Sequence, residues 1–425
     1  MPLRLPYTLL WLIALPLVLL RLAWRARRQP AYLRHVGERF ARYNVRPAAP
    51  VVWIHAVSVG ETRAAEPLVR ALLARWPDHQ VVLTHMTPTG RDTSRALFGD
   101  DTRVLRVYLS YDIGFLATRF LRHFRPRLAV IMETELWPNL LACCSARAIP
   151  VMLANARLSE RSAGRYRRWP RLTRVTLGTL TAVGCQTEAD ADRLAALGAH
   201  GVSVTGNIKF DIAPPADQIA LGDAFRARFQ GRPVILAAST REGEEALILD
   251  ACIAHCPGNV LITLVPRHPQ RFGEVAALVE SRGLKLQRRS DGAPVRRETR
   301  VWLGDSMGEM FAYYAAADVA LMGGSWLPFG GQNLIEACAV GTPVVLGPHT
   351  YNFGQVAEQA VTCGAALRAA DVDGGLCAAL ALLGDTARRD AAGVAGHEFA
   401  QAHRGATQRT MAILERLAAG ASHAP

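Results

Sequence analysis

Short apolar segments alternate with amphipathic segments along most of the chain after residue 50. The apolar ones have the length and composition of buried strands, and residues 63–75 have the pattern of a helix. Strands are expected at residues 51–56, 80–85, 128–132, 151–154 and 181–185. Alternation of this kind is typical of parallel sheets whose strands are joined by helices. The sequence therefore predicts an α/β fold.

A second series of the same kind begins after the segment 211–217 (DIAPPAD), whose two prolines indicate a linker. Its strands are expected at residues 233–238, 260–265, 301–303, 319–322 and 343–346. We therefore expect two Rossmann-like domains, over residues 29–213 and 214–425. Ligands of doubly wound sheets bind at the carboxyl ends of the strands, so the site is expected in a cleft that both domains line.

The N-terminus carries an apolar run at residues 5–20 (LPYTLLWLIALPLVLL) that contains no charged side chain. Arg21, Arg25, Arg27 and Arg28 follow it directly. This order disfavours a cleaved signal peptide, whose positive charge precedes its apolar run. A single membrane-spanning helix and a helix lying in the membrane interface both fit. Residues 1–28 are expected to be an anchor, and their arginines place the rest of the protein on the cytoplasmic side.

The formal net charge of +13 calls for an anionic partner. Nucleic acid, an anionic membrane surface and a phosphorylated substrate all satisfy this condition. The eight cysteines form no paired C-x-x-C set, which argues against a zinc site and favours buried thiols in a reducing compartment.

Three polar motifs of the first half follow expected strands or close the domain. Glu61 lies in HAVSVGET, where it is either an acid favoured at a helix start or a general base. Glu133 comes directly after a strand in ETELWPN and is the better cleft candidate of that motif, since Glu135 could cap the next helix. Lys209 in GNIKFD either pairs with Asp211 or neutralises an acidic sugar.

In the second half, Arg267 in PRHP follows a strand, where its guanidinium could hold a phosphate through two parallel hydrogen bonds. Residues 305–310 (DSMGEM) open a helix whose free amides could bind an anion. Paired glycines in GGSW and GGQNLIE precede a helix in which Glu336 could reach a ribose. The chain has neither G-x-G-x-x-G nor a Walker lysine here, which excludes dehydrogenase and P-loop functions.

Taken in order, SVGET, METELWPN, ANARLS, GNIKFD, PRHP and MGEM resemble the 3-deoxy-D-manno-octulosonate (Kdo) transferase family of Gram-negative bacteria. This resemblance extends over nearly the whole chain except its last ~70 residues. It implies a GT-B glycosyltransferase fold, CMP-Kdo as the donor and the tetraacylated lipid A precursor (lipid IVA) as the acceptor. It also implies attachment to the inner membrane, with lipopolysaccharide as the biosynthetic product.

The resemblance also assigns roles to residues. Glu61 matches the proton acceptor of the family, and Glu133 and Lys209 match the residues that stabilise the transition state. The matching CMP-binding residues are Pro266, Arg267, Met307, Gly308, Glu309, Asn333, Leu334, Ile335 and Glu336. This chain departs from many members at Gln332 and Leu334, which places the details of the donor pocket in question. No metal and no cofactor besides the donor substrate is expected.

The expected partners are therefore CMP-Kdo, the lipid A precursor and membrane phospholipid, with no nucleic acid. Residues 164–171 (GRYRRWPR) interleave arginine with aromatic residues, which suits either an interface with phosphate headgroups or a solvated basic helix. Two other functions compete. One is a GT-B transferase that uses a UDP-sugar on another lipid intermediate, and the other is a non-catalytic membrane-bound protein that binds anions.

Overall fold

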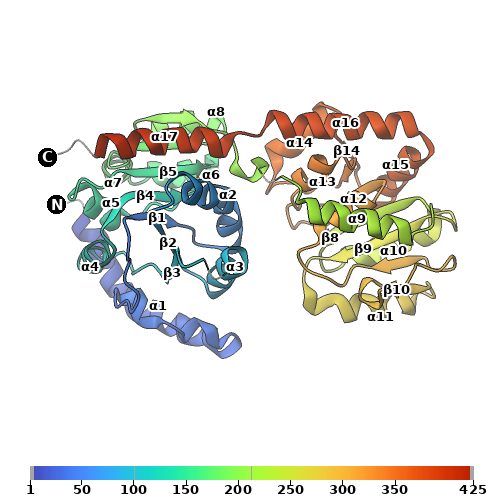
Figure 1. The fold of residues 1–425 in the computed structure, drawn as a ribbon, viewed down its shortest axis with the longest axis horizontal. Coiled ribbons are helices and arrows are strands. Elements are labelled where there is room, and N and C mark those ends of the chain that lie inside the picture. The colour runs from blue at the N-terminus through green and yellow to red at the C-terminus, as the bar shows by residue number, and fades with distance from the viewer. Residues whose placement is uncertain (1–3, 100, 212, 422–425) are drawn as a thin grey trace. The chain divides into compact units, whose positions relative to one another are not determined.

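The structure is a computed structural model that describes residues 4–99, 101–211 and 213–421. The chain divides into two compact units (Figure 1). The first consists of Met1–Asp211 with Arg404–Pro425, and the second of Ile212–His403. Each unit contains one seven-stranded parallel sheet covered by helices, so the α/β class expected from the sequence is confirmed.

The sheet of the first unit has the strand order β3-β2-β1-β4-β5-β6-β7. Its strands are β1 Val51–His55, β2 Gln80–His85, β3 Val104–Tyr108, β4 Pro126–Met132, β5 Val151–Ala156, β6 Ala182–Cys185 and β7 Val202–Val204. Its helices are α1 Leu5–Arg28, α2 Val59–Arg75, α3 Pro88–Phe98, α4 Gly114–Phe124, α5 Pro138–Ser145, α6 Glu160–Arg167, α7 Pro170–Leu177, α8 Glu188–Ala196 and α17 Ala406–Ala421, with 3-10 turns at Pro30–Leu33, Val36–Phe40 and Ile208–Asp211.

Successive residues of β1 point to opposite faces of this sheet and build two separate cores. Trp53 belongs to the cluster that contains Phe120 of α4, whereas Ile54 belongs to the cluster that contains Leu68 of α2 and Leu414 of α17. A strand buried on both faces favours apolar side chains on both, which explains why residues 51–54 of β1 appear in the sequence as a continuous apolar run.

The sheet of the second unit has the order β10-β11-β9-β8-β12-β13-β14. Its strands are β8 Val234–Thr240, β9 Leu261–Pro266, β10 Leu286–Arg288, β11 Val301–Leu303, β12 Val319–Met322, β13 Val344–Leu346 and β14 Ala366–Arg368. Its helices are α9 Ala216–Arg228, α10 Glu244–His255, α11 Phe272–Ser281, α12 Met310–Ala316, α13 Ile335–Val340, α14 Gly354–Thr362, α15 Val372–Gly384 and α16 Thr386–Ala402, with 3-10 turns at Pro269–Arg271 and Arg289–Asp291. Trp302 of β11 packs edge-on against Phe225 and Phe229 of α9.

The C-terminal boundary differs from the expected one. Residues 214–425 were expected to form the second domain, but the chain returns to the first unit at Arg404. Asp211 fixes the segment that leads into α17, because its carboxylate accepts hydrogen bonds from the backbone N–H groups of Gly405 (2.6 Å) and Thr407. The helix that follows, α17, then buries Leu414 in the first core.

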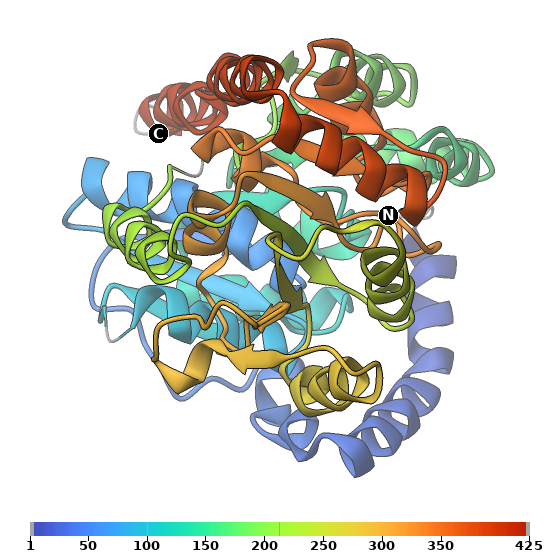
Figure 2. The same cartoon turned by 90° about the vertical axis from the view of Figure 1, so that its right-hand side faces the viewer.

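Helix α1 lies along the first unit as a curved helix with Pro16 in its interior (Figures 1 and 2). It is the single helix, within residues 4–99, 101–211 and 213–421, that is long and apolar enough to cross a membrane. One side packs through Trp11 and Leu15 on a cluster around Tyr111. The other side leaves apolar side chains exposed, namely Leu5, Leu9, Leu10, Leu12, Ile13, Leu17, Leu20 and Trp24. Residues 1–3 of the expected anchor lie outside the described part of the chain.

We predict that Leu414→Ala destabilises the first unit, because this fully buried side chain joins α17 to the core of a sheet whose own chain segment ends at residue 211. Truncation of a buried leucine costs about 2–5 kcal/mol. Hydrogen exchange should therefore become faster in β1 and β4 but not in β8. The matched substitution Arg416→Ala, on the exposed side of α17, should leave the exchange unchanged. Equal effects of both substitutions would contradict the packing role of α17.

Candidate active site

The first unit has its topological switch point between β1 and β4, where the strand order reverses. In doubly wound sheets, ligands bind beyond the carboxyl ends of the strands at this point. Glu61 lies in the first turn of α2, directly after β1, and Glu133 directly follows β4. Two of the acids expected from the sequence therefore lie at the position where this fold binds its ligands.

The carboxylate of Glu61 is held by the residues that begin α2. Its Oε2 accepts the backbone N–H of Val57 at 2.7 Å, and its Oε1 accepts the hydroxyl of Ser58 at 3.0 Å. Ser58 is the N-cap, and its oxygen accepts the backbone N–H of Glu61 in return. This reciprocal arrangement is a variant of the capping box. The helix-start role weighed for Glu61 is therefore present, and it fixes the carboxylate in one orientation.

Burial sets the protonation of Glu61, which is 9% exposed. Its pKa is raised from the ordinary value of 4.5 to about 7, chiefly by desolvation and to a smaller extent by the negative charges of Glu133 and Glu135. The hydrogen bonds from Val57 and Ser58 act in the opposite direction, since they favour the ionised form. A carboxyl group that titrates near neutral pH can accept a proton in one state and donate it in the other.

Glu133 and Lys209 form an ion pair, with 3.3 Å between Nζ and Oε1. Both side chains are about one-third exposed, so the pair remains open to a ligand. Glu133 adopts a left-handed backbone conformation with φ of 57°, which a non-glycine residue holds only at an energetic cost and which clusters at functional sites. Lys209 therefore does not pair with Asp211, because that carboxylate binds the start of α17.

Asn155 supports this pair and was not singled out from the sequence. It is fully buried near the end of β5, also with a positive φ of 55°. Its side-chain oxygen accepts the backbone N–H of Ile208 at 3.0 Å, directly before Lys209. The available signal was an asparagine at a strand's carboxyl end, within the ANARLS motif. Asn155 therefore positions the segment that carries the lysine.

Glu135 does not cap α5, which begins after Trp137. Its Oε2 instead accepts the indole N–H of Trp137 at 3.1 Å. The Trp137 ring packs edge-on against His55 at the end of β1, with 5.6 Å between ring centroids. The segment after β4 is thereby fixed beside the end of β1.

The second unit has its switch point between β8 and β12. The segments predicted to bind the donor lie at the carboxyl ends of three strands, β11, β9 and β12, of which β11 and β9 are neighbours and β12 is separated from β9 by β8. Pro266 ends β9 and Arg267 follows it, whereas residues 307–309 follow β11 and residues 333–336 follow β12. The structure thus brings the donor-binding residues expected from the sequence to one edge of the sheet.

Positive charge gathers at this edge. Burial lowers the pKa of His268, and the charges of Arg241, Arg267 and Arg271 lower it further. Three guanidinium groups are therefore close enough to a single imidazole to disfavour its protonation. Arg271 is paired with Glu245 at 2.6 Å, and Arg267 is exposed at the surface. Such a group of cations at a sheet edge suits a phosphate.

Glu244, an acid in the first turn of α10, organises the glycine-rich segment after β12. It is fully buried, and its carboxylate accepts the backbone N–H groups of Gly324 (2.7 Å) and Trp326 (3.0 Å). Gly324 has a positive φ of 69°, and a Cβ there would lie 3.0 Å from the amide of Gln332. Glu244 therefore holds a turn that requires glycine.

Asn333 and Glu336 form one unit at the start of α13. The side chain of Asn333 accepts the backbone N–H of Ile335 and donates to Oε1 of Glu336, both at 3.1 Å. The pKa of the buried Tyr314 is raised by desolvation and by Glu336, and Arg267 opposes this rise. Arg267 and Glu336 therefore act on the same buried hydroxyl. Leu334 and Ile335 are themselves buried, so their side chains support the turn.

Of the residues after β11, Met307 and Gly308 are exposed, and Gly308 has a positive φ of 83°. The carboxylate of Glu309 is engaged by Arg289 through two contacts of 2.9 Å and accepts the hydroxyl of Ser306. Its side chain therefore fixes the loop, and the exposed backbone of residues 307–308 is the part that remains open to a ligand.

Across residues 4–99, 101–211 and 213–421, no group of three or more His, Cys, Asp and Glu side chains is arranged to hold a metal ion. The expectation that transfer needs no metal stays a prediction.

Comparison with known proteins agrees with this arrangement. The sequence profile of the family described as 3-Deoxy-D-manno-octulosonic-acid transferase (kdotransferase) matches residues 34–212. The chain is 46% identical over 422 residues to the 3-deoxy-D-manno-octulosonic acid transferase of Bordetella pertussis, covering 96% of this chain and 98% of that protein. It is 38% identical over 418 residues to the corresponding Haemophilus influenzae protein, covering 96% and 97%.

Solved structures show the same fold at low sequence identity. The Anabaena protein Alr3699/HepE in complex with UDP matches with a TM-score of 0.59 at 14% identity, covering 87% of this chain and 100% of that one. The UDP-GlcNAc 2-epimerase of Neisseria meningitidis matches with a TM-score of 0.59 at 16% identity, covering 86% and 100%. The fold is GT-B, as expected. With close relatives along nearly its whole length, the chain belongs to the 3-deoxy-D-manno-octulosonic acid transferase family.

Proposed function

We propose that this enzyme transfers Kdo from CMP-Kdo to the lipid A precursor lipid IVA at the cytoplasmic face of the inner membrane. Glu61 is the general base of the proposed reaction. The observation that carries this proposal is the buried Glu61 carboxylate, whose pKa is raised to about 7 beside the Glu133–Lys209 pair. Family membership supports the nature of the transferred sugar.

The proposed reaction forms one bond and breaks one bond at the anomeric carbon of Kdo. The oxygen of an acceptor hydroxyl attacks this carbon, its proton passes to Glu61, and the bond to the phosphate breaks with its electron pair leaving on CMP. The anomeric carbon carries positive charge as this bond breaks, and the charge of Glu133 stabilises it. Lys209 balances the carboxylate of Kdo and pairs with Glu133 through their 3.3 Å contact.

The donor site of the proposal is the carboxyl edge of the second sheet. Arg267 holds the single phosphate of CMP, and the exposed amides of residues 307–308 lie at the start of a helix, where anions are favoured. Glu336 binds the ribose hydroxyls with Asn333 fixing its orientation at 3.1 Å. CMP carries one phosphate, so the proposed reaction does not need a divalent metal that bridges two phosphates.

Membrane attachment is assigned to α1 in this proposal. Its exposed apolar side faces the lipid phase and its last turns carry Arg21, Arg25 and Arg27, which favours anionic headgroups. Both the acceptor and the enzyme then reside at the same surface.

Incubation of the purified chain with CMP-Kdo and lipid IVA, followed by mass spectrometry of the lipid, tests the function directly. Addition of whole Kdo residues is expected, and their number is read from the same spectrum. Parallel reactions with UDP-sugars are the comparison. Sugar transfer from a UDP-sugar alone would replace the proposed donor.

Glu61→Gln keeps the shape of the side chain but cannot accept a proton, so turnover should fall by ~10²–10⁴-fold. In the wild type, the base works ionised, so kcat/KM should rise about tenfold per pH unit below pH 7 and level off above it. Steady-state rates between pH 5 and 9 provide the measurement. Glu66→Gln, which alters an acid of the same helix that is paired with Arg70, should behave as the wild type.

The substitution Glu133→Gln distinguishes the role of Glu133 from that of Glu61. Its negative charge is one cause of the raised pKa of Glu61, so the acid limb of the pH profile should move to lower pH in this variant. A limb that stays at pH 7 in Glu133→Gln, or a Glu61→Gln enzyme within a few-fold of the wild type, would exclude Glu61 as the base.

Arg267→Ala should weaken CMP binding by about 1.5–3 kcal/mol, the range for a hydrogen bond to a charged group. Glu336→Ala should weaken it through the lost ribose contact. Calorimetric titration with CMP measures both. Arg282→Ala provides the control, because this arginine lies after α11 and pairs with Asp250. Unchanged CMP affinity in both test variants would remove the edge of the second sheet from the donor site.

A further inference from the structure

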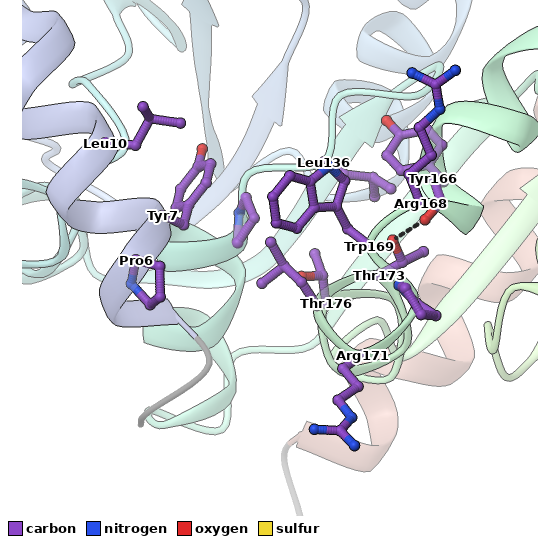
Figure 3. Close-up of a pocket in the computed structure, with 13 residues that line it drawn as sticks. Pro6, Tyr7, Leu10, Leu136, Tyr166, Arg168, Trp169, Arg171, Thr173 and Thr176 are labelled. Atoms are coloured by element: carbon purple, nitrogen blue, oxygen red, sulfur yellow. Dashed lines mark hydrogen bonds between the residues drawn. The ribbon is translucent and has the colours of Figure 1, made fainter.

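The first unit contains a pocket of about 700 Å³ that is separate from the residues assigned to catalysis (Figure 3). Three segments line it, namely the first turns of α1, the Leu136–Pro138 segment after β4, and the corner that joins α6 to α7. Its volume lies within the ~300–1,000 Å³ that is typical of ligand sites.

Apolar side chains make up most of its walls. Leu10 comes from α1, Leu136 from the segment after β4, and Trp169 and Leu172 from the α6–α7 corner. Trp169 is 69% exposed and Leu10 is 65% exposed, so the pocket opens to the outside through apolar residues. In Figure 3 the Trp169 ring extends towards the side of the pocket that α1 forms. Such a surface fits a hydrocarbon chain.

Two cations stand at its margin. Arg168 and Arg171 flank Trp169 and Pro170 in the sequence, and Figure 3 shows their guanidinium groups pointing away from the apolar residues. Neither forms an ion pair with a carboxylate in the part of the chain that the structure describes, whereas the neighbouring Arg167 is paired with Glu160 at 2.8 Å. Both are thus available to an anion bound outside the apolar part.

The pocket adjoins the candidate catalytic acids of the same unit. Leu136 directly follows Glu135, and Glu135 helps to raise the pKa of the pocket residue Tyr166, although burial is the larger cause. Helix α1 is fixed beside this segment, because the Thr8 hydroxyl accepts a hydrogen bond of 3.0 Å from the Asn139 amide. A ligand in the pocket therefore lies next to the segment that carries Glu133.

We propose that this pocket binds one acyl chain of the glycolipid acceptor while Arg168 and Arg171 pair with its phosphate. The inference rests on the proposed function, since that function supplies an acceptor with both acyl chains and phosphates. Helix α1 forms one wall and also presents the exposed apolar side of the unit, so the pocket opens where acyl chains lie. The position beside the Glu133 segment favours the acceptor over a bulk phospholipid, because a chain held there places the acceptor sugar near the acids.

The test compares lipid IVA with its fully deacylated form, using the full chain in detergent micelles. Affinity is measured by equilibrium binding and kcat/KM by Kdo transfer. Each methylene removed from water is worth about fourfold in affinity, so the wild type should prefer the acylated acceptor strongly. Leu10→Asp and Trp169→Asp, on opposite walls, should each reduce this preference at least tenfold. Arg168→Ala combined with Arg171→Ala should weaken binding of both phosphorylated acceptors.

Ile13→Asp is the matched control, since Ile13 is 73% exposed on α1 but does not line the pocket. It should keep the wild-type preference. An equal loss in Ile13→Asp would assign the effect to membrane attachment, and an unchanged preference in Leu10→Asp and Trp169→Asp would exclude the pocket. Binding to phosphatidylglycerol vesicles that contain no acceptor is measured for the same variants. If Leu10→Asp and Trp169→Asp weaken this binding as much as they weaken binding of the acylated acceptor, the occupant of the pocket is a phospholipid. Failure of the proposed function gives a different result, because no Kdo transfer is then observed. The binding measurements still show in that case whether the pocket holds an acyl chain.

Discussion

Both sheets of this protein are parallel throughout and have helices packed on them, so their central strands are buried along nearly their whole length. A buried strand cannot carry a charged side chain in its interior without a large desolvation cost. Charged side chains of the central strands are therefore confined to the carboxyl and amino ends of these strands. The candidate site follows from this constraint, because the strand order reverses between β1 and β4 and brings Glu61 and Glu133 to the same edge.

The same burial that organises the fold sets the chemistry of Glu61. A carboxyl group whose pKa rises from 4.5 to about 7 on folding makes the folded state less stable as pH rises through this window. A change of this size corresponds to on the order of 3 kcal/mol above pH 7. The hydrogen bonds from Val57 and Ser58 offset part of the cost, and they also fix the direction in which the carboxylate can accept a proton.

The sequence predicted the inner strands of both sheets but not β3, β7, β10 or β14, and these are the four edge strands. An edge strand is paired on one side only and is partly exposed, so it need not be continuously apolar, and Arg106 in β3 shows this. Strand β10 shows the same, since it includes Arg288. The return of α17 to the first unit was not predicted either, because an amphipathic helix does not specify which sheet it covers.

The site was predicted where a motif carries an ionisable group at a strand end, as for Glu61 and Glu133. The residues that hold these groups were harder to identify. Asn155 and Glu244 are buried and bind backbone N–H groups, and this role depends on loops distant in sequence that no local pattern specifies. The contact between Lys209 and Glu133 joins positions 76 residues apart and was likewise not predictable from spacing.

The central claim is that burial beside two other acids keeps the Glu61 carboxyl protonated up to neutral pH. Difference infrared titration of the wild type against Glu61→Gln measures this directly through the protonated carboxyl band. The account predicts a band assigned to Glu61 that disappears with a midpoint near pH 7. A midpoint near 4.5, the value of an ordinary exposed glutamate, would contradict it.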